Sequence, residues 1–101
     1  MSGWAPLFIA AALVSATTPQ QDEIGQRAYA QGYREGYPAG MNDARHRSTP
    51  NPQRSSRFRK ATHGEPSGCG CRELYQREYR IGFLDGYQRG FAIREEARFR
   101  K

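Results

Sequence analysis

The chain has 101 residues and a formal net charge of +6, with 11 glycines and 2 cysteines. This length allows one small domain at most and excludes a large buried core. A helical unit of this size is marginally stable unless a covalent link or a partner chain supports it, so oligomerisation is expected.

The first element in the chain is an apolar run over residues 4–16 that ends in Val14-Ser15-Ala16. The run is too short to span a bilayer, and small residues at its end suit cleavage by signal peptidase. We predict a signal peptide over residues 1–16 and export to the periplasm or the exterior. Residues 1–3 carry no lysine or arginine, so an uncleaved anchor and a short buried helix are the alternatives.

The next element is a predicted helix over residues 17–47. Thr18 stands where an N-cap residue belongs, and Pro19 follows at the first helical position, where its missing N–H costs nothing. Pro38 lies inside the segment and removes one backbone hydrogen bond. We therefore expect either a kink near this proline or two shorter helices.

A glycine followed by an aromatic or other large residue recurs at every fourth position in two copies, around residues 29–41 and 79–91. A strand has period two and a helix period 3.6, so this spacing predicts helices with one flat face and bulky flanks. The residues predicted to pack the helices together are Gly32, Gly36, Gly40, Tyr33 and Tyr37 in the first copy and Gly82, Gly86, Gly90, Phe83, Tyr87 and Phe91 in the second.

Glycine inside a helix costs about 1 kcal/mol relative to alanine, so the glycines of the two copies together with Gly25 forfeit about 6 kcal/mol. Close approach of a second backbone, with rings of one helix over the glycines of the other, would offset this cost. The alternative is a weak or partly disordered helix that merely tolerates them.

Between the copies lies a predicted basic linker over residues 48–70, rich in proline, serine and glycine. Residues 44–72 contain seven cations and one acid, a balance of 7 − 1 = +6. Arginines in such a segment can neutralise phosphates, and the predicted polyanion-binding residues are Arg45, Arg47, Arg54, Arg57, Arg59 and Lys60. A solvated charged linker is the other interpretation, and Phe58 either docks on the helices or is exposed.

The second helix is predicted over residues 71–101, directly after Cys69 and Cys71. In an exported protein these thiols should be oxidised. A local disulfide at the start of the helix, a bridge to another copy, and redox or metal chemistry are the three alternatives. His46 and His63 match no zinc-binding spacing with the cysteines, so no metal site is predicted.

No catalytic constellation stands out. Asp85 lies on the second repeat with Arg89 four residues later, a spacing typical of a surface ion pair. The glycines follow the helical period, so they do not form a phosphate-binding loop. We predict a protein that is not an enzyme and has no cofactor or small-molecule substrate.

The predicted fold is all-α, with the two repeat helices arranged as an antiparallel hairpin, or as a helical dimer, joined by the long basic loop. The first repeat is slightly acidic and the second slightly basic, which favours their pairing. The predicted function is an exported structural or protein-interaction module whose partner is a second copy or another envelope protein. Polyanion binding through the basic middle segment is the alternative.

The chain resembles small, uncharacterised exported bacterial proteins in which Gly-Tyr/Phe-x-x-Gly repeats flank an arginine-rich centre. The resemblance is carried by Gly32-Tyr33, Gly36-Tyr37, Asp43-Ala44-Arg45, Asn51-Pro52, Gly82-Phe83 and Gly90-Phe91. It implies export and helices but no known activity. Similar repeats also resemble helices in a flagellar export ATPase regulator and in a eukaryotic iron–sulfur adaptor, both cytoplasmic.

Overall fold

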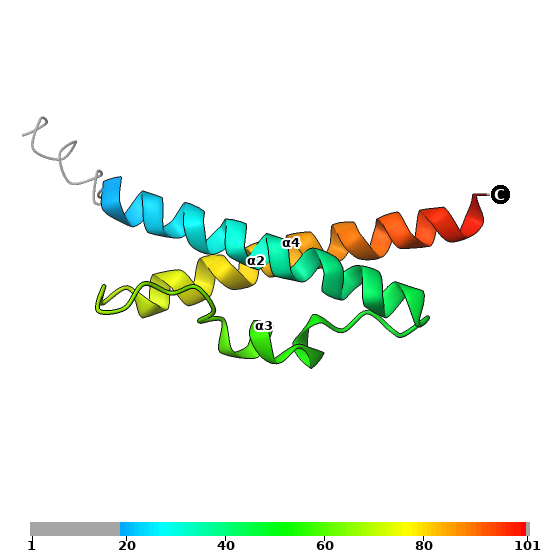
Figure 1. The fold of residues 1–101 in the computed structure, drawn as a ribbon, viewed down its shortest axis with the longest axis horizontal. Helices are drawn as coiled ribbons and strands as arrows, with labels where there is room; N and C mark the ends of the chain where they lie inside the picture. Colours follow the sequence, from blue (N-terminus) through cyan, green and yellow to red (C-terminus); the bar gives the residue numbers. More distant parts are fainter. Residues whose placement is uncertain (1–18, 101) are drawn as a thin grey trace, which may run out of the picture.

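A computed structural model describes residues 19–100 of the chain (Figure 1). Two long helices, α2 (Pro19–Arg45) and α4 (Arg72–Phe99), cross near their middles and separate towards both ends. Residues 46–71, the connecting segment, contain a 3-10 helix η1 (Pro52–Arg54) and a short helix α3 (Ser56–Lys60). Within residues 19–100 every regular element is a helix, which confirms the predicted all-α class.

The two long helices run parallel, so the predicted antiparallel hairpin is wrong. Tyr29 of α2 lies against Gly82 of α4, and Tyr37 lies against Gly90, so the numbering rises in the same direction on both helices (Figure 1). A helix of 27 residues is about 40 Å long, whereas residues 46–71 can extend to about 85 Å. The connecting segment is therefore long enough to return to the start of the pair.

The two helices are related by an approximate two-fold axis along the pair. Equivalent repeat positions are 50 residues apart, as for Gly32 and Gly82 (82 − 32 = 50). Gly32 lies against the backbone of Tyr79, and Gly82 lies against the backbone of Tyr29, its two-fold counterpart. The same exchange holds for the other two glycines of each copy, so the duplication in sequence is also a duplication of contacts.

The repeat glycines bring the two backbones into direct contact. A Cβ at Gly36 would overlap the carbonyl oxygen of Phe83, and one at Gly86 would overlap that of Tyr33. The hydrogen in that position points at the oxygen instead, as in Cα–H···O contacts between close helices. Ala28 continues the row of small residues by one position and is fully buried.

The core lies between α4, the connecting segment and α2, which contributes the buried Ala28. Tyr79 is fully buried, and Phe83 is 1% exposed. Phe58 of α3 packs on Phe83 with ring centroids 5.4 Å apart, and Ala61 next to α3 is fully buried. Of the two alternatives for Phe58, docking is therefore the one observed, and the connecting segment is a packed element rather than a solvated linker.

Helix boundaries lie close to the predicted ones. The first helix was expected over residues 17–47 and the second over 71–101, against Pro19–Arg45 and Arg72–Phe99 in the structure. Helix α2 continues through Pro38, so the alternative of two shorter helices is wrong. The predicted signal peptide lies outside the described residues. Among residues 19–100, no helix combines the length and apolar character needed to cross a membrane.

Candidate interaction surface

The carboxylate of Glu35 is the point where α2, α4 and the connecting segment meet. One of its oxygens accepts a hydrogen bond from the Tyr79 hydroxyl. The other accepts from Gln31 at 2.5 Å and from Arg57 at 2.9 Å, and it also contacts His63 Nδ1. These bonds attach the connecting segment to both helices, although no pattern in the sequence had singled out Glu35.

The same network shifts two pKa values. Burial by itself raises the pKa of Glu35, but the bonds from Tyr79, Gln31 and His63 outweigh burial and hold that pKa below its usual range. For Tyr79, burial first and the Glu35 carboxylate second raise the pKa of the phenol well above its ordinary value. Glu35 is therefore ionised and Tyr79 neutral at pH 7, as the hydrogen bond between them requires.

Two further side chains of α4 hold the connecting segment by hydrogen bonds. Tyr87 donates to the Asp43 carboxylate and accepts the backbone N–H of Asn51 at 2.9 Å. Arg80 donates to the backbone carbonyls of Phe58 at 3.2 Å and Arg59 at 2.6 Å. Backbone groups of the segment thus find partners on the helix, which fixes its path.

Three of the six predicted polyanion-binding residues bind other parts of the chain. Arg57 pairs with Glu35, and Arg54 lies 3.4 Å from the Asp43 carboxylate. Arg59 donates to two backbone carbonyls of the connecting segment, each at 2.8 Å. These arginines stabilise the docked segment, which therefore does not present all six cations as one free surface.

The other three cations lie apart from this group. Lys60 is exposed at the end of α3. Arg45 at the end of α2 and Arg47 just after it line a hollow with Arg94 and Arg98 of α4. The two arginines from α4 were not among the predicted residues, because they lie about 50 residues away along the chain.

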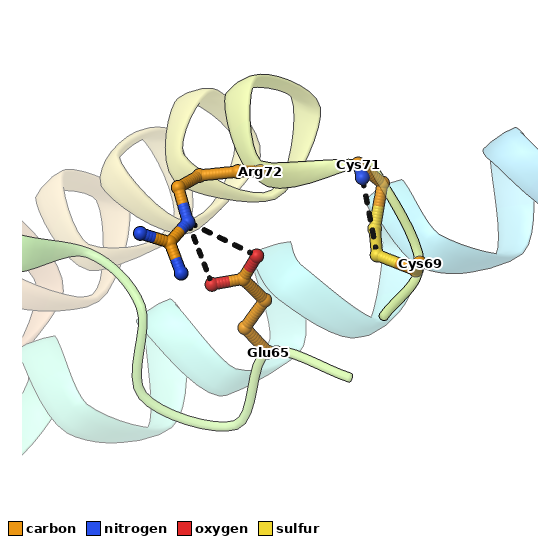
Figure 2. The surroundings of a disulfide bond; sticks show 4 residues. All are labelled: Glu65, Cys69, Cys71 and Arg72. Atoms are coloured by element: carbon orange, nitrogen blue, oxygen red, sulfur yellow. Dashed lines mark hydrogen bonds and ion pairs between the residues drawn. A yellow bond between two sulfur atoms is a disulfide. The ribbon is translucent and has the colours of Figure 1, made fainter. Parts of the chain in front are cut away.

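The two cysteines form a local disulfide immediately before α4 (Figure 2). Their Cα atoms are 5.2 Å apart, and the backbone N–H of Cys71 donates to the sulfur of Cys69 at 3.2 Å. Arg72, the first residue of α4, pairs with Glu65 at 3.3 Å. Within residues 19–100 no group of three or more His, Cys, Asp or Glu side chains is arranged to hold a metal ion.

The tyrosine row of α2 lies on the face of the pair that the connecting segment leaves open. Tyr29, Tyr33 and Tyr37 form a ladder with centroids 6.3 and 6.4 Å apart. The three are half-buried, whereas their two-fold counterparts on α4 are buried beneath the connecting segment. Tyr29 donates to Asp85 at 2.5 Å, so Asp85 binds this tyrosine instead of forming the expected pair with Arg89.

We call Tyr29, Tyr33, Tyr37 and Asp85 the open tyrosine face. Its Tyr29–Asp85 bond is the two-fold counterpart of the Tyr79–Glu35 bond on the covered face. The Asp85 hydrogen bond is also the main cause that raises the pKa of Tyr29. One face of the pair thus already holds a peptide segment, and the related face offers a similar ladder with its own carboxylate.

No family model, curated protein or solved structure matches the chain. The resemblance to small exported bacterial proteins stays a prediction.

Proposed function

We propose that the protein is a small exported helical module that binds another polypeptide through the open tyrosine face and performs no catalysis. The observation that supports this function is the difference between the two related faces. The ring row of α4 is covered by the connecting segment, whereas that of α2 is half-buried. Tyrosine supplies a large contact area and a polar hydroxyl, which is why it is enriched in protein interfaces.

The first partner we propose is a second copy of the chain. A unit of this size has a small core and gains stability when aromatic surface is buried between copies. A two-fold homodimer uses the same patch on both molecules, which would put the Tyr33 rings near the centre of the contact. Another envelope protein is the second partner we propose for the same face.

Sedimentation velocity over a range of concentrations tests self-association. Tyr33→Ser should shift a dimer to monomers, because it removes the middle ring of the ladder. Leu84→Ser is the matched control, since Leu84 is 36% exposed on α4 and lies outside the open tyrosine face. A wild-type protein that stays monomeric at high concentration would contradict the homodimer.

An envelope partner is tested by photo-crosslinking in an exporting bacterial host. A photoreactive phenylalanine at position 33 should give a discrete crosslinked product, and the same group at position 84 should not. Equal crosslinking from both positions would contradict the open tyrosine face as the binding surface.

Export is part of the same proposal. The predicted cleavage after Ala16 would leave a chain beginning at Thr17, and the Cys69–Cys71 disulfide is compatible with an oxidising compartment. The intact mass of the protein recovered from an exporting host should match this chain with both cysteines oxidised. An unprocessed chain with free thiols would contradict export.

Polyanion binding through the basic middle segment remains the alternative function. Arg54, Arg57 and Arg59 already have partners in the chain, which weakens the original set of six. Arg45 and Arg47 favour the alternative, because they meet further arginines at the end of the helix pair.

A further inference from the structure

Four arginines converge where α2 and α4 separate at their C-terminal ends. Arg45 is the last residue of α2, Arg47 follows it in the connecting segment, and Arg94 and Arg98 come from α4. With Ala97 they line a hollow of about 230 Å³, which we call the arginine hollow. Its members lie in two groups along the chain, so only the parallel packing of the helices brings them together.

The positive charge of the hollow is largely uncompensated. Arg98 pairs with Glu95 at 2.9 Å, and Arg45 donates to the uncharged side chain of Asn42 at 3.0 Å. Within residues 19–100, the side chains of Arg47 and Arg94 have no hydrogen-bond or ion-pair partner. Four guanidinium groups thus share one carboxylate, and like charges gathered in a hollow attract an anion strongly.

The negative end of the α2 dipole offsets part of this charge, and the last carbonyls of α2 take up one guanidinium N–H of the hollow. The carbonyl of Asp43 accepts the N–H of Ser48 at 2.9 Å. The carbonyl of Ala44 accepts the N–H of Arg47 at 3.0 Å and also a guanidinium N–H of Arg98. The end of the helix is therefore capped, and the remaining guanidinium N–H groups are free to bind a ligand.

Arg47 takes part in the hollow at an energetic cost. Its φ of +56° is left-handed, at a position after the helix where glycine or asparagine is usual. A non-glycine residue in this conformation is strained, because its Cβ crowds the backbone. Here the turn brings an arginine side chain to the hollow, where it has no partner within the described residues.

We propose that the arginine hollow binds a phosphate group. Guanidinium groups form paired hydrogen bonds to phosphate oxygens, and several of them can surround one phosphate. The site is distinct from the open tyrosine face, so it does not depend on the interaction function proposed above. The phosphate belongs either to a soluble compound or to the headgroup of an anionic lipid, and the experiment below separates these sources.

Two titrations at low salt test the site. In the first, inorganic phosphate is added to the full-length protein and heat of binding is measured. In the second, the protein is mixed with vesicles of phosphatidylcholine, with and without phosphatidylglycerol, and co-sedimentation is measured. Binding in the first titration identifies a soluble phosphate ligand, whereas binding only to the phosphatidylglycerol vesicles identifies a lipid headgroup. In either case, affinity should fall steeply as salt is added.

The variant Arg47→Gln/Arg94→Gln should lower the affinity at least tenfold, because it removes the two arginines that have no partner. The matched control is Arg27→Gln/Arg89→Gln, which removes the same charge at exposed positions outside the hollow. Its affinity should fall much less than that of the hollow variant, since neither Arg27 nor Arg89 lines the hollow. Thermal unfolding of both variants checks that they fold.

Absence of binding to both phosphate and phosphatidylglycerol vesicles at low salt would overturn the proposal. An equal loss of affinity in the two variants would also overturn it, because net charge alone would then account for binding.

Discussion

Replacing Gly36 with alanine tests the central feature of the fold, the direct contact between the two helix backbones. A Cβ at this position would overlap the Phe83 carbonyl oxygen and would lie 2.9 Å from both the carbonyl carbon and the Cα of Phe83. All three atoms belong to the backbone of α4, so none can move away by a side-chain rotation. The helices would have to separate locally.

The expected effect is the balance of two opposing terms. Alanine stabilises a helix interior by about 1 kcal/mol relative to glycine. Overpacking typically costs about 1–3 kcal/mol, and the upper end applies here because separation also loosens the neighbouring glycine contacts. We expect Gly36→Ala to lower the free energy of unfolding by about 2 kcal/mol. For a unit of this size, this change corresponds to a fall in melting temperature of about 8–16 °C.

Gly25→Ala is the matched control on the same helix. A Cβ at Gly25 would meet only the Glu78 and Leu74 side chains, at 3.5 and 4.0 Å, which is ordinary van der Waals contact. The alanine should therefore stabilise the protein by about 1 kcal/mol, with a rise in melting temperature of about 4–8 °C.

Thermal unfolding followed by circular dichroism measures both variants in one experiment. The essential result is that the two variants change the melting temperature in opposite directions, since helix propensity alone predicts a rise at both positions. A rise for Gly36→Ala comparable to that for Gly25→Ala would refute backbone contact between α2 and α4. Gly86→Ala, the two-fold counterpart, should behave like Gly36→Ala, and a stabilising effect there would refute the two-fold arrangement.

Three further predictions concern the connecting segment. Tyr79→Phe removes a hydrogen-bond donor to the Glu35 carboxylate, so urea unfolding should show a free energy of unfolding lower by about 1–3 kcal/mol. Tyr29→Phe, on the open tyrosine face, should lower it less. Equal losses would contradict the difference in burial between the two tyrosines. The pKa of Glu35 is lower in the folded chain than its ordinary value of 4.5, so its stabilisation is present above pH 4.5 and is lost as the pH falls through the folded pKa. In an acid titration, the stability of Glu35→Gln should therefore fall less steeply than that of the wild type. An unchanged profile would exclude this carboxylate as a cause of the destabilisation in acid. The disulfide closes a loop of only three residues, so Cys69→Ser should cost about 1–2 kcal/mol in the same urea assay; complete unfolding of this variant would contradict that estimate.

The sequence by itself determined the helices and the faces by which they pack. A four-residue spacing of glycine is a local property of a helix, since residues at i and i+4 share one side whatever the rest of the chain does. Gly32 and Gly82 could therefore be assigned to an interface before any partner was known. Ala28 was missed, although it extends the same spacing with another small residue.

Only the tertiary structure decided the direction of the helices and the path of the connecting segment. Parallel and antiparallel pairs can both bury the same row of glycines, so the repeat alone does not choose between them. The parallel arrangement lets Phe58 pack on Phe83 and lets Arg57 reach Glu35, contacts that join residues 25 and 22 positions apart. Such contacts depend on where a long segment finds burial and hydrogen-bond partners, and these conditions leave no regular spacing in the sequence.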